Sequence, residues 1–133
     1  MANNMLRVML DTNVLISAVF NSGTAPARSI RVAGANHRLV LCDYVIEECR
    51  GVIKKKFPHF LELFEALLTE TDLEIFTGDA PHSFPIPDPK DQPILDAAVA
   101  ANIDVLISGD KHFANLQIKR PTICTPSQFL DSY

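Results

Sequence analysis

Short apolar segments alternate along the chain with longer segments in which apolar residues recur at helical spacing. The apolar segments predict short strands, at residues 6–10, 39–42, 73–77, 105–107 and the start of 123–130. The intervening segments predict helices, at residues 14–20, 24–35, 43–56, a stretch opened by Pro58, 92–101 and the end of 123–130. Asp43 can cap the helix at 43–56. Strands that alternate with helices predict an α/β fold with a mostly parallel central sheet.

Prolines mark the one long loop that the sequence predicts. Five of the nine prolines fall between Pro81 and Pro93, and they predict an extended loop over residues 78–89. The chain has 133 residues, of which 47% are hydrophobic, so it can form a buried core. We therefore expect one domain over residues 1–133 and interpret the loop as part of it.

The sequence lacks the features of a membrane or secreted protein. No apolar run approaches the ~18 residues of a membrane span, and the first residues have no signal-peptide character. Cys42, Cys49 and Cys124 form no C-x-x-C pair and complete no zinc spacing with the four histidines. We therefore expect three buried, reduced thiols in a cytoplasmic protein.

Charge is unevenly distributed along the chain. The 12 basic and 16 acidic side chains give a formal net charge of −4, which disfavours a globally basic nucleic-acid binder. Residues 24–60 nevertheless carry a net charge of +4, whereas residues 61–110 carry −10. One part of the chain can therefore attract a polyanion that another part repels.

Two acids lie just after predicted strands. Asp11 directly follows residues 6–10, and Asp110 comes three residues after the last residue of the strand at 105–107. In open parallel sheets the functional crevice lies outside the carboxyl ends of the strands, so both acids are placed to meet there. The alternative is that each acid only caps the following helix, which is a common role for Asp.

Two further acids occupy positions that face the protein interior. On a helical projection of residues 43–56, Glu48 lies on the flank of the apolar arc, whereas Glu47 lies opposite it. Asp91 lies in the middle of the apolar stripe of its helix, whereas Asp96 projects away from Asp91. The alternatives are that Glu48 is a second surface acid and that Asp91 is a helix cap.

Four converging carboxylates would repel one another without a cation. Sites with only oxygen ligands suit Mg²⁺ or Mn²⁺, and such sites at a sheet edge serve phosphodiester hydrolysis. The four acids also equal the excess of acidic over basic residues. The net charge therefore permits a nucleic-acid substrate once metal is bound.

Five segments together resemble those of a known protein family. Their sequences are VMLDTNVL at 8–15, VIEECRGVI at 45–53, DPKDQPILDAA at 88–98, VLISGDKHF at 105–113 and ICTPSQFL at 123–130. In this order and spacing they resemble the PIN-domain ribonucleases, which include the VapC-like toxins of toxin–antitoxin pairs. The resemblance covers almost the whole chain. It implies a three-layer α/β/α sandwich with the acids in a central groove.

The resemblance also implies a function and a site. It implies cleavage of single-stranded RNA to 5′-phosphate and 3′-hydroxyl ends, with Mg²⁺ or Mn²⁺ as cofactor, a cognate antitoxin as partner and a homodimer. It selects four metal-holding and catalytic acids, which are Asp11, Glu48, Asp91 and Asp110. Ser108 and Asn13 are candidates for orienting a carboxylate or the attacking water.

Two positions near these acids carry open questions. His112 stands where many relatives have an Asp, and an imidazole there favours softer metals than Mg²⁺. Asp88 is either an auxiliary acid or a turn residue before Pro89.

The basic residues are candidates for holding the RNA backbone. They are Arg28, Arg31, Arg50 and the run that begins at Lys54. The alternative is a solvated basic face. Phe57, Phe60 and Phe64 similarly form either core or a partner surface.

Two other functions compete with the nuclease. One is a non-catalytic module that binds RNA or protein, which the presence of all four acids disfavours. The other is a phosphatase or phosphotransfer enzyme. A haloacid-dehalogenase-type enzyme needs a second Asp where this chain has Asn13.

Overall fold

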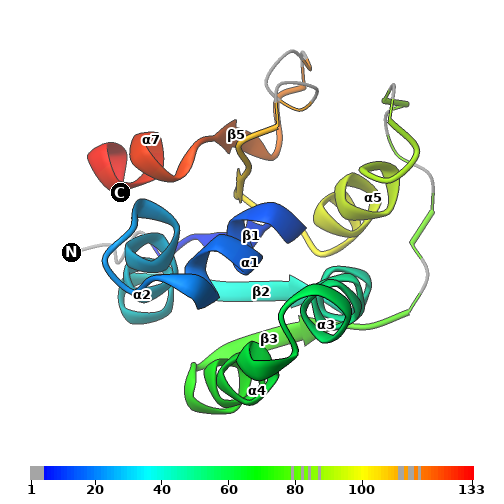
Figure 1. Ribbon diagram of the computed structural model, residues 1–133. Helices are drawn as coiled ribbons and strands as arrows, with labels where there is room; N and C mark the ends of the chain where they lie inside the picture. Colours follow the sequence, from blue (N-terminus) through cyan, green and yellow to red (C-terminus); the bar gives the residue numbers. More distant parts are fainter. Residues whose placement is uncertain are drawn as a thin grey trace.

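The computed structural model describes residues 5–78, 80, 81, 83, 85, 86, 88–110, 113, 116 and 118–133. Its strands form one parallel sheet in the order β3-β2-β1-β4-β5 (Figure 1). The strands are β1 (Arg7–Leu10), β2 (Arg38–Cys42), β3 (Leu73–Phe76), β4 (Val105–Ile107) and β5 (Thr122–Cys124). The sequence therefore predicted both ends of the first four strands, and the start of the last, to within one residue.

Helices connect the strands and cover the sheet. They are α1 (Thr12–Phe20), α2 (Ala25–Asn36), α3 (Asp43–Lys56), α4 (Leu61–Glu70), α5 (Gln92–Ala100) and α7 (Pro126–Ser132). From β1 to β2 to β3 the chain moves in one direction along the sheet, and from β3 to β4 it moves in the other direction. Because both kinds of connection are right-handed, the helices of the first two connections cover one face of the sheet and the helix between β3 and β4 covers the opposite face. The result is the expected α/β/α sandwich. Among the described helices, none is both long and apolar enough to cross a membrane.

The central strands are buried completely. Residues 8–10 of β1 have no exposed surface, and residues 105–107 of β4 are at most 1% exposed. Covering both faces of a parallel sheet excludes water from both sides of its strands, which explains their continuous apolar runs. The apolar faces of α1, α3 and α5 complete this core.

Two local predictions differ from the structure. The helix expected to open at Pro58 begins as a 3₁₀ turn, Pro58–Phe60, and continues as α4. The prediction that Asp43 caps α3 is wrong. Asp43 is the first helical residue, and its carboxylate accepts hydrogen bonds from the backbone N–H of Tyr44 (2.8 Å) and Gly78 (3.0 Å). It therefore ties α3 to the loop after β3.

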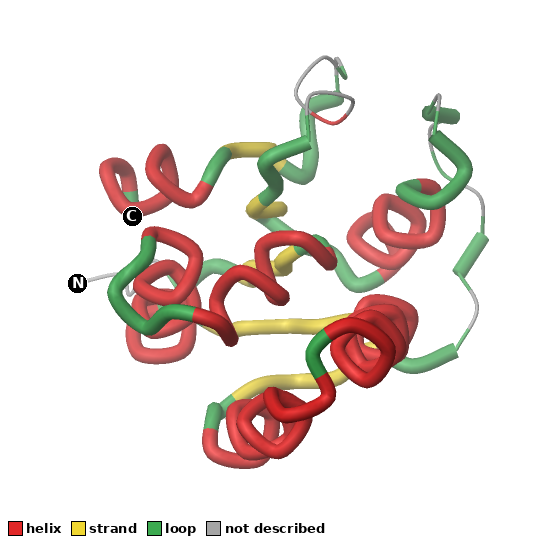
Figure 2. Tube along the Cα trace, in the orientation of Figure 1, coloured by secondary structure: helices red, strands yellow, loops and turns green. Residues whose placement is uncertain are grey.

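The loop between β3 and α5 follows the extended path that its prolines predict, in the part that the structure describes (Figure 2). Asp96 of α5 anchors it, since its buried carboxylate accepts from the N–H (2.9 Å) and hydroxyl (2.7 Å) of Ser83. The side chain of Gln92 accepts from the N–H of Ile86 at 3.1 Å. The face of α5 that points away from Asp91 thus holds the loop.

The remaining thiols and aromatic rings divide between core and surface. Cys42 and Cys49 are buried free thiols, but Cys124 is only half-buried, which corrects the expectation of three buried thiols. Phe64 is fully buried, whereas Phe57 is 38% exposed. Phe57 and Phe60 both pack edge-on against Phe20, with centroids 4.9 Å apart, and so form a partly exposed aromatic cluster.

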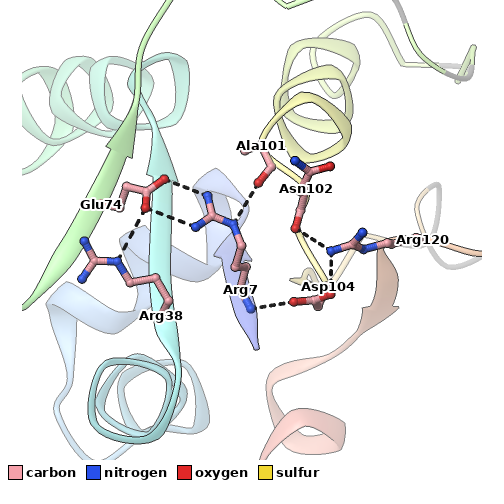
Figure 3. A network of polar contacts seen from close by, with 7 residues as sticks. All are labelled: Arg7, Arg38, Glu74, Ala101, Asn102, Asp104 and Arg120. Carbon is pink, nitrogen blue, oxygen red and sulfur yellow. Dashed lines mark hydrogen bonds and ion pairs between the residues drawn. The ribbon is translucent and has the colours of Figure 1, made fainter. Parts of the chain in front are cut away.

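A polar network joins the strands at their amino ends (Figure 3). The guanidinium of Arg7 donates to both carboxylate oxygens of Glu74, at 3.2 and 2.7 Å, and to the carbonyl of Ala101 at 2.9 Å. Its backbone N–H donates to Asp104 at 2.8 Å. Arg7, the one charged residue of the first apolar run, therefore links β1 to β3 and to the segment before β4.

Two more arginines extend this network. Arg38 of β2 lies 3.6 Å from the same Glu74 carboxylate. Arg120 donates to Asp104 (2.8 Å) and to the carbonyl of Asn102 (2.9 Å). The network spans the sheet at the edge opposite to the strand ends that carry the acids.

Replacing Arg7 tests how much this network stabilises the fold. We expect Arg7→Ala to lower the free energy of unfolding by about 1–2 kcal/mol, because a bidentate pair and a backbone contact are lost at a partly exposed site. Arg7→Lys should recover less than half of the loss, since an ammonium lacks the planar fork. Urea unfolding measures the free energy of unfolding of both variants. An unchanged urea midpoint for the alanine variant would show that the network is dispensable for stability.

Candidate active site

Strand pairing brings the first and last predicted acids to one edge of the sheet. β1 and β4 are neighbours, with Leu10 opposite Ile107, and the N–H of Asp11 donates to the carbonyl of Ile107 at 3.1 Å. Asp11 therefore lies beside the turn that carries Ser108 and Asp110. In Figure 1 the arrow of β2 points toward this edge, where α3 and α5 also lie.

Asp11 both caps a helix and faces the other acids. One carboxylate oxygen accepts from the N–H of Val14 at 2.9 Å, which confirms the capping interpretation. The other accepts from the hydroxyl of Ser108, and the Ser108 oxygen accepts from the N–H of Asp110 at 3.0 Å. Asp11 and Ser108 are each 3% exposed, so this hydrogen bond is nearly dry, whereas Asp110 is half-buried.

Glu48 is held by two hydroxyl groups. Thr12 donates to one of its oxygens, and Tyr44 lies 3.3 Å from the other. Glu47, in contrast, has a 69% exposed side chain that pairs with Arg50. The helical projection therefore distinguished the inward glutamate from the outward one.

Asp91 stands at the start of α5, facing Asp110. It occupies the N-cap position, but its side chain makes no capping bond with the helix backbone. A hydrogen bond to Asp110 links the two carboxyl groups. The Tyr44 hydroxyl lies 3.3 Å from the carbonyl of Lys90, so one tyrosine touches both Glu48 and the segment that presents Asp91.

Burial and mutual repulsion disfavour the ionised acids. Burial raises the pKa of Asp11, and the charges of Asp110 and Glu48 raise it further. Hydrogen bonds from Ser108 and from the N–H of Val14 act in the opposite direction.

Asp91 has the larger shift. Burial, the hydrogen bond to Asp110 and the charges of Asp110, Asp88 and Asp11 together raise the pKa of Asp91 to about 7. Asp91 is therefore partly protonated near neutrality, beside the carboxyl group of Asp110. A pair of this kind takes up a cation readily, because the cation favours the doubly ionised form.

The donor set fits a hard divalent cation. All four groups are carboxylates, which suit Mg²⁺ or Mn²⁺. Among the residues that the structure describes, no three His, Cys, Asp or Glu side chains are close enough to form a ready-made metal site. The acids are nevertheless near enough that their charges raise the pKa of Asp11 and that of Asp91. The fit therefore rests on donor chemistry and charge.

Comparison with known proteins identifies the family. A sequence model of the family described as PIN domain matches residues 7–112. The chain belongs to the PIN domain family. All four acids lie within the matched range. A search of curated proteins found no match.

Solved structures share this PIN fold. VapBC2 from Rickettsia felis, crystallised with a DNA fragment from its promoter, is similar with a TM-score of 0.67 and 17% identity, over 90% of this chain and 97% of that one. VapC20 from Mycobacterium tuberculosis, a Sarcin-Ricin loop cleaving toxin, is similar with a TM-score of 0.58 and 14% sequence identity, over 80% of this chain and 92% of that one. At sequence identities this low, the similarity shows only that the fold is shared.

The sequence left open the roles of Asp88, His112 and Asn13 near the acids of this PIN domain, and the structure describes two of these residues. The carboxylate of Asp88 accepts from the N–H of Lys90 at 2.9 Å, which confirms a turn role, and its charge also reaches Asp91. His112 lies outside the described residues. Asn13 is exposed, and the neighbouring Thr12 is the residue that contacts Glu48.

The candidate RNA contacts of the PIN domain lie away from its acids. Arg50 pairs with Glu65, at 2.6 and 2.8 Å, as well as with Glu47, so its guanidinium is already occupied. Lys54 lies about 9 Å further along α3 than Glu48, at 1.5 Å per residue. Arg28 and Arg31 lie on α2, which leads to the opposite edge of the sheet.

Sequence reasoning missed the two hydroxyl groups on Glu48. Thr12 follows Asp11 directly, so the turn that caps α1 also presents its hydroxyl toward α3. Tyr44 lies one helical turn before Glu48, and this i, i+4 spacing was the available signal.

Proposed function

We propose that this chain is a metal-dependent endoribonuclease that hydrolyses single-stranded RNA to 5′-phosphate and 3′-hydroxyl products. The observation that carries the proposal is the meeting of acids from the end of β1, the β4 turn and α5, where burial and the neighbouring carboxyl groups raise the pKa of Asp91 to about 7. Membership of the PIN domain family supports it. RNA, in preference to DNA, follows from the resemblance of the sequence to PIN-domain ribonucleases.

Each polar residue has a defined part in this proposal. Four acids would hold Mg²⁺ or Mn²⁺ directly or through water, and they are Asp11, Glu48, Asp91 and Asp110. When bound, the metal supplies a water of lowered pKa and stabilises negative charge on the attacking and leaving oxygens. Ser108 orients Asp11 by its hydrogen bond, and Thr12 and Tyr44 orient Glu48.

The basic residues of the surface and the similarity to VapBC2 suggest how the protein binds its substrate and its partners. Arg28, Arg31 and Lys54 are the basic residues that we assign to the RNA backbone, whereas Arg50 serves an ion-pair cluster. The similarity to VapBC2 supports a toxin role with a cognate antitoxin. A homodimeric assembly follows only from the resemblance of the sequence to PIN-domain ribonucleases.

A cleavage assay tests the reaction. Single-stranded RNA, structured RNA and DNA are each incubated with the protein in Mg²⁺, Mn²⁺ or EDTA. We expect cleavage of single-stranded RNA with metal only, leaving 5′-phosphate ends. Binding of RNA without cleavage in either metal would instead favour a non-catalytic PIN module.

Replacing Glu48 tests the assignment of the acids. We expect Glu48→Gln to lower the cleavage rate by about 100-fold, because one ligand charge is lost while both hydroxyl partners stay in place. Glu62→Gln, on the exposed face of α4, is the matched control and should leave the rate unchanged. Initial rates at saturating Mg²⁺ measure the effect, and equal rates for the two variants would remove Glu48 from the site.

A further inference from the structure

A cavity of about 970 Å³ lies between the start of α3, the loop after β3 and the first turns of α5. Its walls include Tyr44 from α3, Ile86 from the loop and Gln92 from α5. Its volume is within the range of small-molecule sites. The four proposed metal-holding acids are not among its lining residues, so it is a separate space beside them.

The cavity adjoins the acids through its own wall residues. Tyr44 lies one helical turn before Glu48, and its hydroxyl contacts both that carboxylate and the carbonyl of Lys90, at 3.3 Å each. Gln92 follows Asp91 directly. A nucleotide whose phosphate sits at the acids would therefore bring its base to this cavity.

The chemistry of the lining favours a base over a phosphate. Three carboxylates line the cavity, those of Asp43, Glu47 and Asp96, and its described lining residues include no Lys, Arg or His. The carboxylate of Asp96 is buried and holds Ser83. Asp43 already accepts from two backbone N–H groups and Glu47 from Arg50, and the remaining acceptor sites of these two carboxylates can accept hydrogen bonds from amino groups, whereas they repel phosphate. An aromatic ring beside it offers a stacking surface, which every base can use.

We propose that this cavity binds the nucleobase next to the scissile phosphate, and that it selects bases with an exocyclic amino group over uracil. Adenine, cytosine and guanine each present an exocyclic amino group with two N–H donors for the carboxylates. Uracil presents a single ring N–H between two carbonyl oxygens, which the carboxylates repel. Tyr44 is the stacking residue. The proposal rests on the endoribonuclease function and names the base selectivity of that same site.

Binding can be tested without catalysis. The chain has two tyrosines, Tyr44 and Tyr133, so incorporated 3-fluorotyrosine gives two ¹⁹F resonances that Tyr133→Phe assigns. Adenosine, cytidine, guanosine and uridine are titrated separately in EDTA. We expect the Tyr44 resonance to shift with the amino-bearing nucleosides and less with uridine, while Tyr133 stays in place. No shift with any nucleoside, or an equal shift with uridine, would overturn the proposal.

Cleavage patterns provide the second test. On a pool of randomised RNA, we expect Tyr44→Phe to keep the wild-type base preference and Tyr44→Leu to flatten it, with KM raised about tenfold at preferred sites. If Tyr44→Leu lowers kcat equally at every site and keeps the preference, Tyr44 only positions Glu48 and the base site is wrong. If no RNA is cleaved in any metal but the Tyr44 resonance responds, the endoribonuclease proposal fails and the base site stands.

Discussion

Asp11→Asn is expected to abolish metal-dependent RNA cleavage while the protein stays folded. The substitution removes the most buried of the four acids, 3% exposed, and with it one charge that a divalent cation needs. The metal's share of transition-state stabilisation is several kcal/mol, so we expect a loss on the order of 10³-fold in kcat. Cleavage of single-stranded RNA in Mg²⁺ and in Mn²⁺ measures it.

The fold should tolerate this change because asparagine preserves the local bonds. Its carbonyl oxygen can still accept from the N–H of Val14, and its amide can donate to the rotated hydroxyl of Ser108. Burial raises the pKa of Asp11, so a neutral group at this position removes an unfavourable charge. In EDTA the variant should therefore melt above the wild type.

Asp131→Asn is the matched control, since Asp131 is an exposed acid on α7. It should change neither the cleavage rate nor the melting temperature. Cleavage retained by Asp11→Asn would refute the site. A lower melting temperature in EDTA would show that Asp11 is chiefly a structural cap.

The sheet and its acids could be predicted because both depend only on short stretches of consecutive residues. A strand buried on both faces needs a continuous apolar run, as in residues 8–10 and 105–107, and the acids follow these runs closely. Helical periodicity alone separated Glu48 from Glu47. These features needed no knowledge of which elements are neighbours.

The surroundings of the site could not be predicted, because they depend on packing between distant segments. The predicted RNA contact Arg50 pairs with Glu65, 15 residues further on, and nothing in its own spacing shows this. Asn13 is a polar residue next to the site, but the geometry of α1 turns Thr12 toward Glu48 instead. Asp96 projects away from Asp91, as predicted, but the sequence did not show that it is buried, with its carboxylate holding Ser83 of the loop after β3.

Without metal, the melting temperature is expected to rise as the pH falls from 7.5 to 5. The folded protein holds Asp91 with its pKa raised from 3.8 to about 7, so over this interval it binds protons that the unfolded chain has released. Stability then decreases as the pH rises through the interval. We expect a difference on the order of 5 °C for a chain of this size, measured in EDTA.

Asp91→Asn isolates this effect from every other titrating group. Glu65 and Glu74 have lowered pKa values, so their stabilising pairs are lost only below the interval. The difference between wild type and variant should therefore decrease steadily as the pH falls toward 5. A wild type that follows the variant at every pH would show that Asp91 ionises freely.

Adding Mg²⁺ should reverse the pH dependence of the wild type. The cation binds the ionised carboxylates, so it stabilises the fold most at pH 7.5, where protons compete least. The same acids that destabilise the metal-free protein at neutral pH would then stabilise the loaded one. If Mg²⁺ shifts wild type and Asp91→Asn equally, the cation binds elsewhere. A shift confined to the wild type would tie the carboxyl pair of Asp91 and Asp110 to metal binding independently of any nuclease assay.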